Sequence, residues 1–358
     1  MRMLMIMQRG RKKASSRVRG WQLVEPLRAC GVEVRHLCLD DYPGEGGSLG
    51  RWWRRWRFLR NLRALQEWAN VVFAQRLIKH RRPLRIILNT HRPLVYDFDD
   101  ALFDHPVDAD GQSLFKAQAS GAGDPEWMAR QQWFLRFVKR ADLCSLTPSL
   151  LDWLKEKYPR KKYVAYLGPV NTSLYRPNPK SREKCIGWVG SPSTAPYLRE
   201  IEDPIHAILD EHPDWKFLVL GAQEKHIGWK NPPRAEYVEW SIETEPVQLQ
   251  RMAIGINPLP DNTWTRGKGA YKVLQYMASG IPSVASPVGV NRDLMEDAQS
   301  GMLAPDAVAW HDALAALMTQ PDRREKLGRE ARRRAEEKHA IPVCAKSLVQ
   351  AIEEIRKG

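Results

Sequence analysis

The chain contains few cysteines and no long apolar run. Its five cysteines in 358 residues are scattered, odd in number and without CxxC spacing. This pattern argues against a disulfide framework or a zinc site and indicates a reducing, cytosolic setting. A membrane-spanning helix needs roughly 20 apolar residues in succession, and no run approaches that length, so none is predicted. The apolar start at 3–7 is too short for a secretory signal and predicts a first strand.

Acidic residues are scarce in the first half of the chain. Residues 1–180 contain 33 Lys and Arg against 17 Asp and Glu, whereas residues 181–358 contain 23 against 25. The electrostatic field of this positive excess attracts a polyanion: nucleic acid, an anionic membrane surface or a phosphate-bearing substrate. With 43% apolar residues and 14 tryptophans, the composition excludes disorder and allows two folded domains.

Short apolar runs alternate with helical patterns along the chain. This alternation is typical of parallel sheets whose strands are joined by crossover helices. Residues 51–79 predict one long helix, and 85–89 predict a strand. The other strands are expected at 3–7, 32–39, 94–98, 143–146, 163–167, 186–189, 216–220, 237–240, 254–257 and 282–285.

A stretch rich in Pro, Asn and Ser at 171–183 interrupts the alternation and predicts a linker. We therefore expect an α/β chain with Rossmann-like domains at 1–170 and 184–338, closed by a helix at 339–358. Two such domains imply a cleft between them. Ligands of these sheets bind beyond the carboxyl ends of the strands.

The most informative segment begins with a basic, glycine-flanked loop at 266–269 (Arg-Gly-Lys-Gly). The loop opens a predicted helix at 270–279, and the N–H groups at a helix start favour anions. Lys268 and Lys272 are four residues apart and share one helical face. Gly289 opens a second helix start. Together these features predict a diphosphate site.

The whole segment 264–303 resembles the donor-binding motif of GT-B glycosyltransferases, in particular family 4, also called group 1. The family pattern includes Tyr-Met-Ala-Xaa-Gly-Xaa-Pro-Val-Val, and LQYMASGIPSV at 274–284 is similar to it. Further similar pieces are VGVN at 288–291, DAQSGML at 297–303, YLGPVNTSLYRP at 166–177, IGWVGSP at 186–192 and LGREAR at 327–332.

This resemblance implies a GT-B fold, in which two Rossmann-like domains face each other across a cleft and the C-terminal helix returns to the N-terminal domain. It implies a glycosyltransferase that retains anomeric configuration and needs no essential metal or bound cofactor. A UDP- or GDP-linked sugar would bind the second domain, and a glycan or lipid-linked acceptor of the cell envelope would bind the first. Fixed cations would stabilise the departing diphosphate.

Several family positions differ in this chain. The family often has two glutamates eight residues apart, and Gly267 and Gln275 stand at those positions here. The loop after the first strand of the second domain lacks the family's basic residues, so we expect Arg266 and Lys268 to carry the catalytic charge. Asp261 is a candidate for the missing carboxylate. The predicted donor-binding residues are Gly190, Ser191, Gly267, Lys272, Gln275, Gly289, Val290, Asn291 and, stacked on the base, Trp240.

Candidate acceptor residues follow predicted strands of the first half. The polar loop at 8–16 borders the cleft in the resembling family, and the acidic run at 96–100 ends another strand. Asp100 is expected to be catalytic. The acidic run also allows two other interpretations, an Asp-Xaa-Asp metal site of the GT-A fold or a helix N-cap. The predicted acceptor-binding residues are Ser15, Ser16, Arg17, Arg19, Asp99 and His105.

Six arginines and three tryptophans fall within residues 51–63. A cationic, Trp-bearing helix suits a membrane interface or an anionic lipid headgroup, which fits a lipid-linked acceptor. The alternative is a helix packed on its own sheet, with the arginine stems lying along its surface. We expect a cytoplasmic protein that contacts the inner face of the cell membrane through this segment.

Two other functions stay open at this point. A sugar-nucleotide epimerase of the same fold would bind the same donor but needs a pair of acid and base groups, which the sequence does not identify. A nucleic-acid-binding protein would use the basic first half and show steep salt dependence. No nucleic-acid motif is present, so nucleic acid is not an expected partner.

Overall fold

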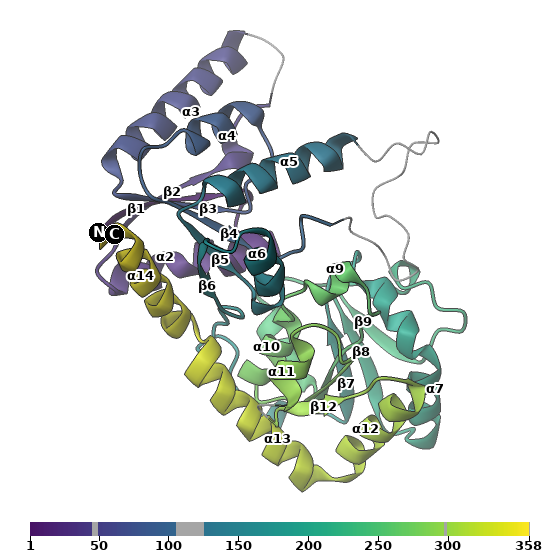
Figure 1. Cartoon of the computed structure of the whole chain (residues 1–358). Coiled ribbons are helices and arrows are strands. Elements are labelled where there is room, and N and C mark those ends of the chain that lie inside the picture. The colour runs from purple at the N-terminus through teal and green to yellow at the C-terminus, as the bar shows by residue number, and fades with distance from the viewer. Residues whose placement is uncertain (45–48, 105–124, 297–298, 358) are drawn as a thin grey trace. The chain divides into compact units, whose positions relative to one another are not determined.

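The chain forms two compact units (Figure 1). Unit 1 combines residues up to 104 with 125–169 and the C-terminal 341–357, and unit 2 comprises 170–340. Each unit has its own parallel sheet. The computed structural model describes residues 1–44, 49–104, 125–296 and 299–357.

Unit 1 contains a six-stranded parallel sheet with the order β2–β1–β3–β4–β5–β6. All residues of β3, β4 and β5 are buried, as expected for parallel strands that are covered on both faces. The strands are β1 (Arg2–Met7), β2 (Glu33–Cys38), β3 (Val71–Gln75), β4 (Leu94–Phe98), β5 (Leu143–Leu146) and β6 (Lys162–Ala165).

The last helix of the chain completes the core of unit 1. Buried side chains of this helix, among them Ala345, Leu348 and Ile352, pack into one apolar cluster with Met3 and Met5 of β1. The chain therefore returns to its first unit after building the second. The helices of unit 1 are α1 (Ala14–Arg19), α2 (Val24–Ala29), α3 (Leu49–Trp68), α4 (Arg81–Leu88), α5 (Pro125–Arg140), α6 (Leu151–Lys157) and α14 (Ile341–Lys357).

Two predictions in this unit are wrong. The helix predicted at 51–79 ends at Trp68, and the following Val-Val-Phe-Ala-Gln run forms β3, which is buried throughout. The strand predicted at 85–89 lies mostly within α4, where Leu84 and Ile87 are buried on one face of an amphipathic helix. Both errors arise because a short apolar run does not by itself distinguish a buried strand from a buried helix segment.

Unit 2 contains a second six-stranded parallel sheet, with the order β12–β11–β10–β7–β8–β9. This order reverses direction between β7 and β10, as in a doubly wound sheet. The strands are β7 (Cys185–Val189), β8 (Lys216–Leu220), β9 (Ala235–Val238), β10 (Ile254–Asn257), β11 (Ser283–Ala285) and β12 (Gly301–Leu303). The predicted fold class, α/β with two Rossmann-like sheets, is confirmed.

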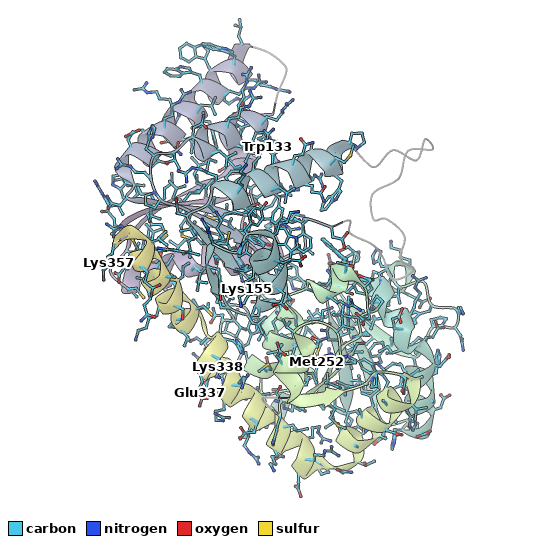
Figure 2. The ribbon with its side chains drawn as sticks, in the orientation of Figure 1. Trp133, Lys155, Met252, Glu337, Lys338 and Lys357 are labelled. Carbon is cyan, nitrogen blue, oxygen red and sulfur yellow. The ribbon has the colours of Figure 1, made fainter. Side chains whose placement is uncertain are left out.

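Seven α-helices accompany this sheet within the described residues of unit 2. Met252, the residue after α8, lies inside the unit, whereas Glu337 and Lys338 point outward (Figure 2). Two short elements, α9 and β12, were not expected from the sequence. The helices are α7 (Glu202–Glu211), α8 (Glu245–Arg251), α9 (Thr263–Arg266), α10 (Tyr271–Ala278), α11 (Asn291–Glu296), α12 (Ala307–Thr319) and α13 (Pro321–Arg334).

The segment predicted as a linker packs onto unit 2. The guanidinium of Arg182 donates hydrogen bonds to the carbonyls of Met252 (3.1 Å), Ser279 (3.0 Å) and Gly280 (2.7 Å). Tyr175 is buried as well. The Pro- and Asn-rich composition of this segment therefore marks an irregular but packed part of unit 2.

Among the helices of the described ranges, none combines the length and apolar character needed to cross a bilayer.

Truncation of Leu348 should destabilise unit 1 selectively. Leu348 is fully buried in the apolar cluster beneath α14, and a large-to-small change in such a core costs about 2–5 kcal/mol. We expect Leu348→Ala to lower the opening free energy of β1 peptides by this amount in hydrogen exchange followed by mass spectrometry. Peptides of β7 should not change. The control is Val308→Ala on α12, where the side chain is 71% exposed. Equal protection of β1 in both variants would contradict this packing.

Candidate functional site

The carboxyl edge of the unit 2 sheet gathers the loops that carry the predicted donor residues. β7 and β10 are neighbours and run parallel, so the loops that follow them emerge at the same edge. The loop after β11 emerges there too, because β11 pairs in parallel with β10. The reversal of strand order between β7 and β10 is the position at which doubly wound sheets bind their ligands.

Residues 262–270 form a small structured platform beyond β10. Asn262 caps α9, since its side chain accepts a hydrogen bond from the Thr265 N–H (2.9 Å) and its own N–H donates to Thr265 Oγ1 (3.1 Å). Ala270 then adopts a left-handed backbone, with φ +47°, immediately before α10. A non-glycine residue in this region costs about 1 kcal/mol or more. The strain lies where the basic loop turns into α10.

Lys268 and Lys272 bring two ammonium groups to this platform. Lys268 Nζ lies 5.1 Å from the ring centroid of Trp264 and 6.0 Å from that of Tyr197. Lys272 Nζ lies 4.5 Å from the ring centroid of Trp188, on β7. Aromatic faces stabilise cations only modestly. Both ammonium groups therefore lie against aromatic rings.

This environment shifts the pKa of Lys272. Burial, followed by the positive charge of Lys268, lowers the pKa of Lys272 to about 7. Within the described ranges, no ion pair joins Lys272 to a carboxylate. An ammonium group in this condition gains most from an anionic ligand, because the negative charge of the ligand offsets both causes of the shift. The site is therefore prepared for negative charge.

Arg266 and Gly289 connect two loops at the same edge. The Arg266 guanidinium forms a bidentate, exposed ion pair with Asp261, at 2.6 and 3.1 Å. Asp261, the candidate for the family's first glutamate, therefore faces Arg266. Gly289 has φ +54°, and a Cβ there would lie 2.5 Å from the Arg266 carbonyl oxygen. The loop after β11 can approach α9 only because residue 289 is glycine.

Gln275 belongs to a buried hydrogen-bond chain that the sequence did not reveal. Its amide donates to the Tyr175 hydroxyl (2.9 Å), which donates in turn to Glu245 Oε2 (2.5 Å). The Trp240 indole N–H donates to Glu245 Oε1 (2.7 Å). Burial raises the pKa of Tyr175 well above its ordinary value, and nearby Tyr271 and Glu245 raise it further. The chain thus supplies a carboxylate, Glu245, two hydrogen bonds away from the position where the family has its second glutamate.

Three further donor candidates have mainly internal contacts. A Cβ at Gly190 would lie 2.3 Å from the Trp188 ring, so glycine is required there for packing. Asn291 is fully buried; its Nδ2 donates to the Ser286 carbonyl (3.0 Å), and its Oδ1 accepts from Asn257 (3.1 Å). The Asn291 side chain is therefore engaged inside unit 2. Val290 is also buried, and Ser191 is exposed beyond β7.

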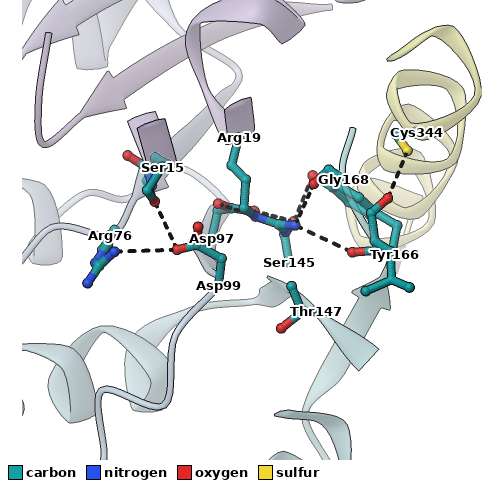
Figure 3. A network of polar contacts seen from close by, with 12 residues as sticks. Ser15, Arg19, Arg76, Asp97, Asp99, Ser145, Thr147, Tyr166, Gly168 and Cys344 are labelled. Atoms are coloured by element: carbon teal, nitrogen blue, oxygen red, sulfur yellow. Dashed lines mark hydrogen bonds and ion pairs between the residues drawn. The ribbon is translucent and has the colours of Figure 1, made fainter. Parts of the chain in front are cut away.

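The carboxyl edge of the unit 1 sheet carries a group of polar side chains (Figure 3). The Ser15 hydroxyl donates to Asp99 Oδ1 (2.9 Å), and the Gln75 amide donates to Ser15 Oγ (3.0 Å). Arg76 lies 2.6 Å from Asp100 and 3.8 Å from Asp99. Burial, followed by the neighbouring Asp100 carboxylate, raises the pKa of Asp99. Asp99 thus holds a proton more readily than an ordinary aspartate does.

Arg19 and Ser16 do not contact the acceptor, contrary to our expectation. Arg19 is 1% exposed, and its guanidinium donates to both oxygens of Asp97 and to the Gly168 carbonyl (3.0 Å) (Figure 3). Burial would lower the pKa of Arg19, but the Asp97 carboxylate raises it above the ordinary value. The Ser16 hydroxyl is buried and donates to Gln75 Oε1 (2.7 Å). Both side chains therefore stabilise the interior of unit 1.

The remaining acceptor candidates are only partly placed. Arg17 is partly exposed, and His105 lies outside the described residues. The alternative of a GT-A metal site in the acidic run is not supported, because the first aspartate of that motif, Asp97, is paired with Arg19. Asp99 and Asp100 are not N-caps either, since no described helix begins directly after them.

The sequence of unit 2 matches a known family. Residues 183–320 match the family model described as glycosyl transferases group 1, which confirms the resemblance carried by 264–303. Spore coat protein SA of Bacillus subtilis (strain 168) is 22% identical over 187 residues, which are 49% of this chain and 50% of that protein. The matched region thus spans about half the length of the curated relative.

Solved structures match nearly the whole chain. Sucrose-phosphate synthase from Thermosynechococcus elongatus has a TM-score of 0.69 at 13% identity, with 99% of each chain covered. HepE from Anabaena, in complex with UDP and glucose, has a TM-score of 0.65 at 12% identity, with 99% of this chain and 100% of that chain covered. At these identities the likeness concerns the fold, and the GT-B fold is confirmed.

Nucleoside diphosphate affinity should depend on the protonation of Lys272. The group is half-neutral near pH 7 in the free protein, and a bound diphosphate raises its pKa, so binding takes up a proton above pH 7. UDP or GDP affinity should therefore be constant just below pH 7 and fall by up to about tenfold per pH unit above it. Titration calorimetry in buffers of different ionisation enthalpy measures this uptake.

Lys272→Arg is the matched control for that titration. A guanidinium stays charged throughout the range, so the affinity of this variant should vary little between pH 7 and pH 9. A wild-type profile that is equally flat would show that Lys272 does not face the bound phosphates.

Removal of Arg19 should leave a buried charge without its partner. Asp97 is fully buried, and breaking a buried ion pair costs about 3–5 kcal/mol. We expect Arg19→Met to destabilise unit 1 by this amount, measured by hydrogen exchange in β4 peptides. The double variant Arg19→Met with Asp97→Asn should recover part of the loss. An unchanged β4 in the single variant would contradict the internal role of Arg19.

Proposed function

We propose that this chain, a GT-B protein whose residues 183–320 match the group 1 glycosyltransferase model, transfers a sugar from a nucleoside diphosphate to a hydroxyl. The observation that carries the proposal is the pair of ammonium groups, Lys268 and Lys272, at the switch edge of the unit 2 sheet. Their mutual repulsion and the burial of Lys272 favour a ligand with at least two negative charges.

The chemistry that this pair serves is departure of the diphosphate. As the bond between the sugar and the diphosphate breaks, negative charge grows on the leaving oxygens. Fixed cations aimed at that charge stabilise the transition state more than the ground state. The N–H groups at the start of α10 and those of Gly289 and Val290 are fixed dipoles that act in the same sense. Arg266, on the exposed side of this edge, is paired with Asp261, so it adds no net positive charge in the free protein.

The nucleoside half of the donor would lie toward the buried chain formed by Gln275, Tyr175 and Glu245. An amide at residue 275 can hydrogen-bond a ribose diol, as the family's glutamate does, and Trp240 offers an aromatic surface for the base. A fold neighbour that holds UDP and glucose supports a UDP-linked sugar as the first donor to test, with GDP-linked sugars next.

The acceptor hydroxyl would bind unit 1, at the edge where Ser15, Asp99 and Asp100 lie. A carboxyl group with a raised pKa accepts a proton from a hydroxyl more readily than an ordinary aspartate does. Asp99 therefore fits this proton transfer better than Asp100, whose carboxylate is engaged by Arg76 at 2.6 Å.

We propose a glycan or lipid-linked acceptor. Retention of configuration, metal independence and a place at the inner face of the membrane belong to the same proposal and follow from the family resemblance and residues 51–63.

Lys268→Ala should abolish most of the turnover while leaving the fold intact. Loss of one charge-stabilising group typically costs about 100- to 1,000-fold in rate, and the side chain is not part of the apolar core. Donor consumption with and without added acceptor measures the effect. Lys184→Ala is the control, because that lysine lies at the opposite edge of the same sheet and is 65% exposed. Wild-type turnover in the Lys268 variant would remove the proposed site.

Thermal stabilisation by ligands identifies the donor class. A ligand that binds only the folded state raises the melting temperature, and the rise grows with the logarithm of its concentration relative to its Kd. We expect UDP or GDP to stabilise unit 2 and the corresponding monophosphates to do so much less, since two phosphates are needed for the lysine pair. An epimerase would convert the sugar nucleotide without acceptor, and a nucleic-acid-binding protein would respond to neither diphosphate.

A further inference from the structure

We propose that the first turns of α3, residues 49–57, form a docking surface for an anionic lipid bilayer. This surface exposes four large apolar side chains on the outside of unit 1. Leu49 is 83% exposed, Trp52 53%, Trp53 60% and Trp56 44%. Folded proteins rarely leave several large apolar side chains together in water without a binding partner.

The four exposed residues share one face of the helix. They stand at positions i, i+3, i+4 and i+7, which is the spacing of a single helical stripe. Phe58 and Leu62 lie on the roughly opposite side, where Leu62 is fully buried. The helix therefore has two apolar faces, one packed on its own unit and one turned outward. Packing on unit 1 accounts for the first face only.

The positive charge of α3 indicates an anionic partner. Arg57 falls on a flank between the two apolar faces and Arg60 falls on the outward face, whereas Arg51, Arg54 and Arg55 lie nearer the side of Phe58 and Leu62. No Asp or Glu occurs between residues 49 and 66. Arg60 lies 5.3 Å from the ring centroid of Trp56. Arginines beside a tryptophan stripe can reach lipid phosphates while the indoles enter the headgroup region. The surface thus combines apolar area with charge complementary to an anionic membrane.

A bilayer fits this surface better than nucleic acid does. The three indoles pack edge to face on one another, at interplanar angles of 86° and 81°. This arrangement covers ring surface that unpaired bases would need for stacking. Leu49 is an aliphatic side chain with no role in stacking or phosphate binding, whereas it contributes directly to partition into a membrane.

The docking surface lies on the same side of unit 1 as the candidate acceptor residues. Phe58 packs edge to face on Tyr42, with ring centroids 5.3 Å apart, and Arg55 Nε donates to the Pro43 carbonyl (3.2 Å). Tyr42 also contacts His80, in the loop after β3. These loops follow β2 and β3, so they emerge at the edge that carries Asp99. If the proposed function holds, docking favours an acceptor hydroxyl carried by a lipid.

Vesicle co-sedimentation tests the surface without any donor or acceptor. The full-length protein is mixed with vesicles of phosphatidylcholine alone and with vesicles containing about one third phosphatidylglycerol. We expect strong binding to the anionic vesicles, weak binding to the neutral ones, and a steep loss of binding with added salt. Because no sugar nucleotide is present, failure here overturns the membrane placement but leaves the proposed sugar transfer intact, and failure of the sugar transfer leaves this result intact.

Substitutions separate the apolar and the charged contributions. Trp52→Ala, Trp53→Ala and Trp56→Ala combined should lower the partition coefficient at least tenfold, and Arg54→Gln with Arg57→Gln should lower it by roughly the same factor. The charge-matched control is Arg323→Gln with Arg329→Gln on α13, which should bind as the unchanged protein does. All variants alter exposed positions, so their melting temperatures should agree within a few degrees.

Three results would overturn the proposal. The first is equal sedimentation with neutral and anionic vesicles. The second is unchanged binding by the triple Trp variant. The third is tighter binding to single-stranded DNA than to anionic vesicles at the same salt concentration, which would assign the surface to nucleic acid.

Discussion

Two ammonium groups that share one sheet edge are the constraint on which the proposed chemistry depends. Lys268 and Lys272 repel each other, and burial adds to the cost of charging Lys272. The fold accepts this cost because α9, its cap and the left-handed Ala270 hold the basic loop against the start of α10. A ligand with two phosphates reverses the sign of the interaction, so the same arrangement that is unfavourable in the free protein becomes favourable in the complex.

The carboxyl edges of the two sheets carry different charged groups. In unit 1, Arg19 pairs with Asp97 inside the unit and Arg76 pairs with Asp100 at the sheet edge. In unit 2 the lysine charges rest on aromatic rings. Paired charges suit the binding of a neutral hydroxyl, and two neighbouring ammonium groups suit a diphosphate. This contrast agrees with a division of the chain into an acceptor unit and a donor unit.

Much of the fold was predictable because the apolar runs are short, separated by clear turn signals and ordered in strict alternation. Most strands, among them β5, β8 and β10, agree with the sequence-based ranges within a few residues. The failures at 71–75 and 85–89 have one cause: a run of four or five apolar residues fits a strand and a helix equally well, and only the neighbouring packing decides. The basic loop at 266–269 was predictable for a different reason, since glycines, lysines and the following helix are all local features.

The sequence by itself determined the α/β class, the two-sheet organisation, the glycine-bracketed cationic loop and the excess of arginine in the first half, because each depends on local composition and periodicity. Only the tertiary structure decided which charges are compensated. It buried Arg19 against Asp97, 78 residues away, connected Gln275 to Glu245 through Tyr175, and turned the tryptophans of α3 outward. When two partners are distant in sequence, the local pattern around either residue does not identify the other. Pairing, burial and exposure therefore follow from the packing of whole elements.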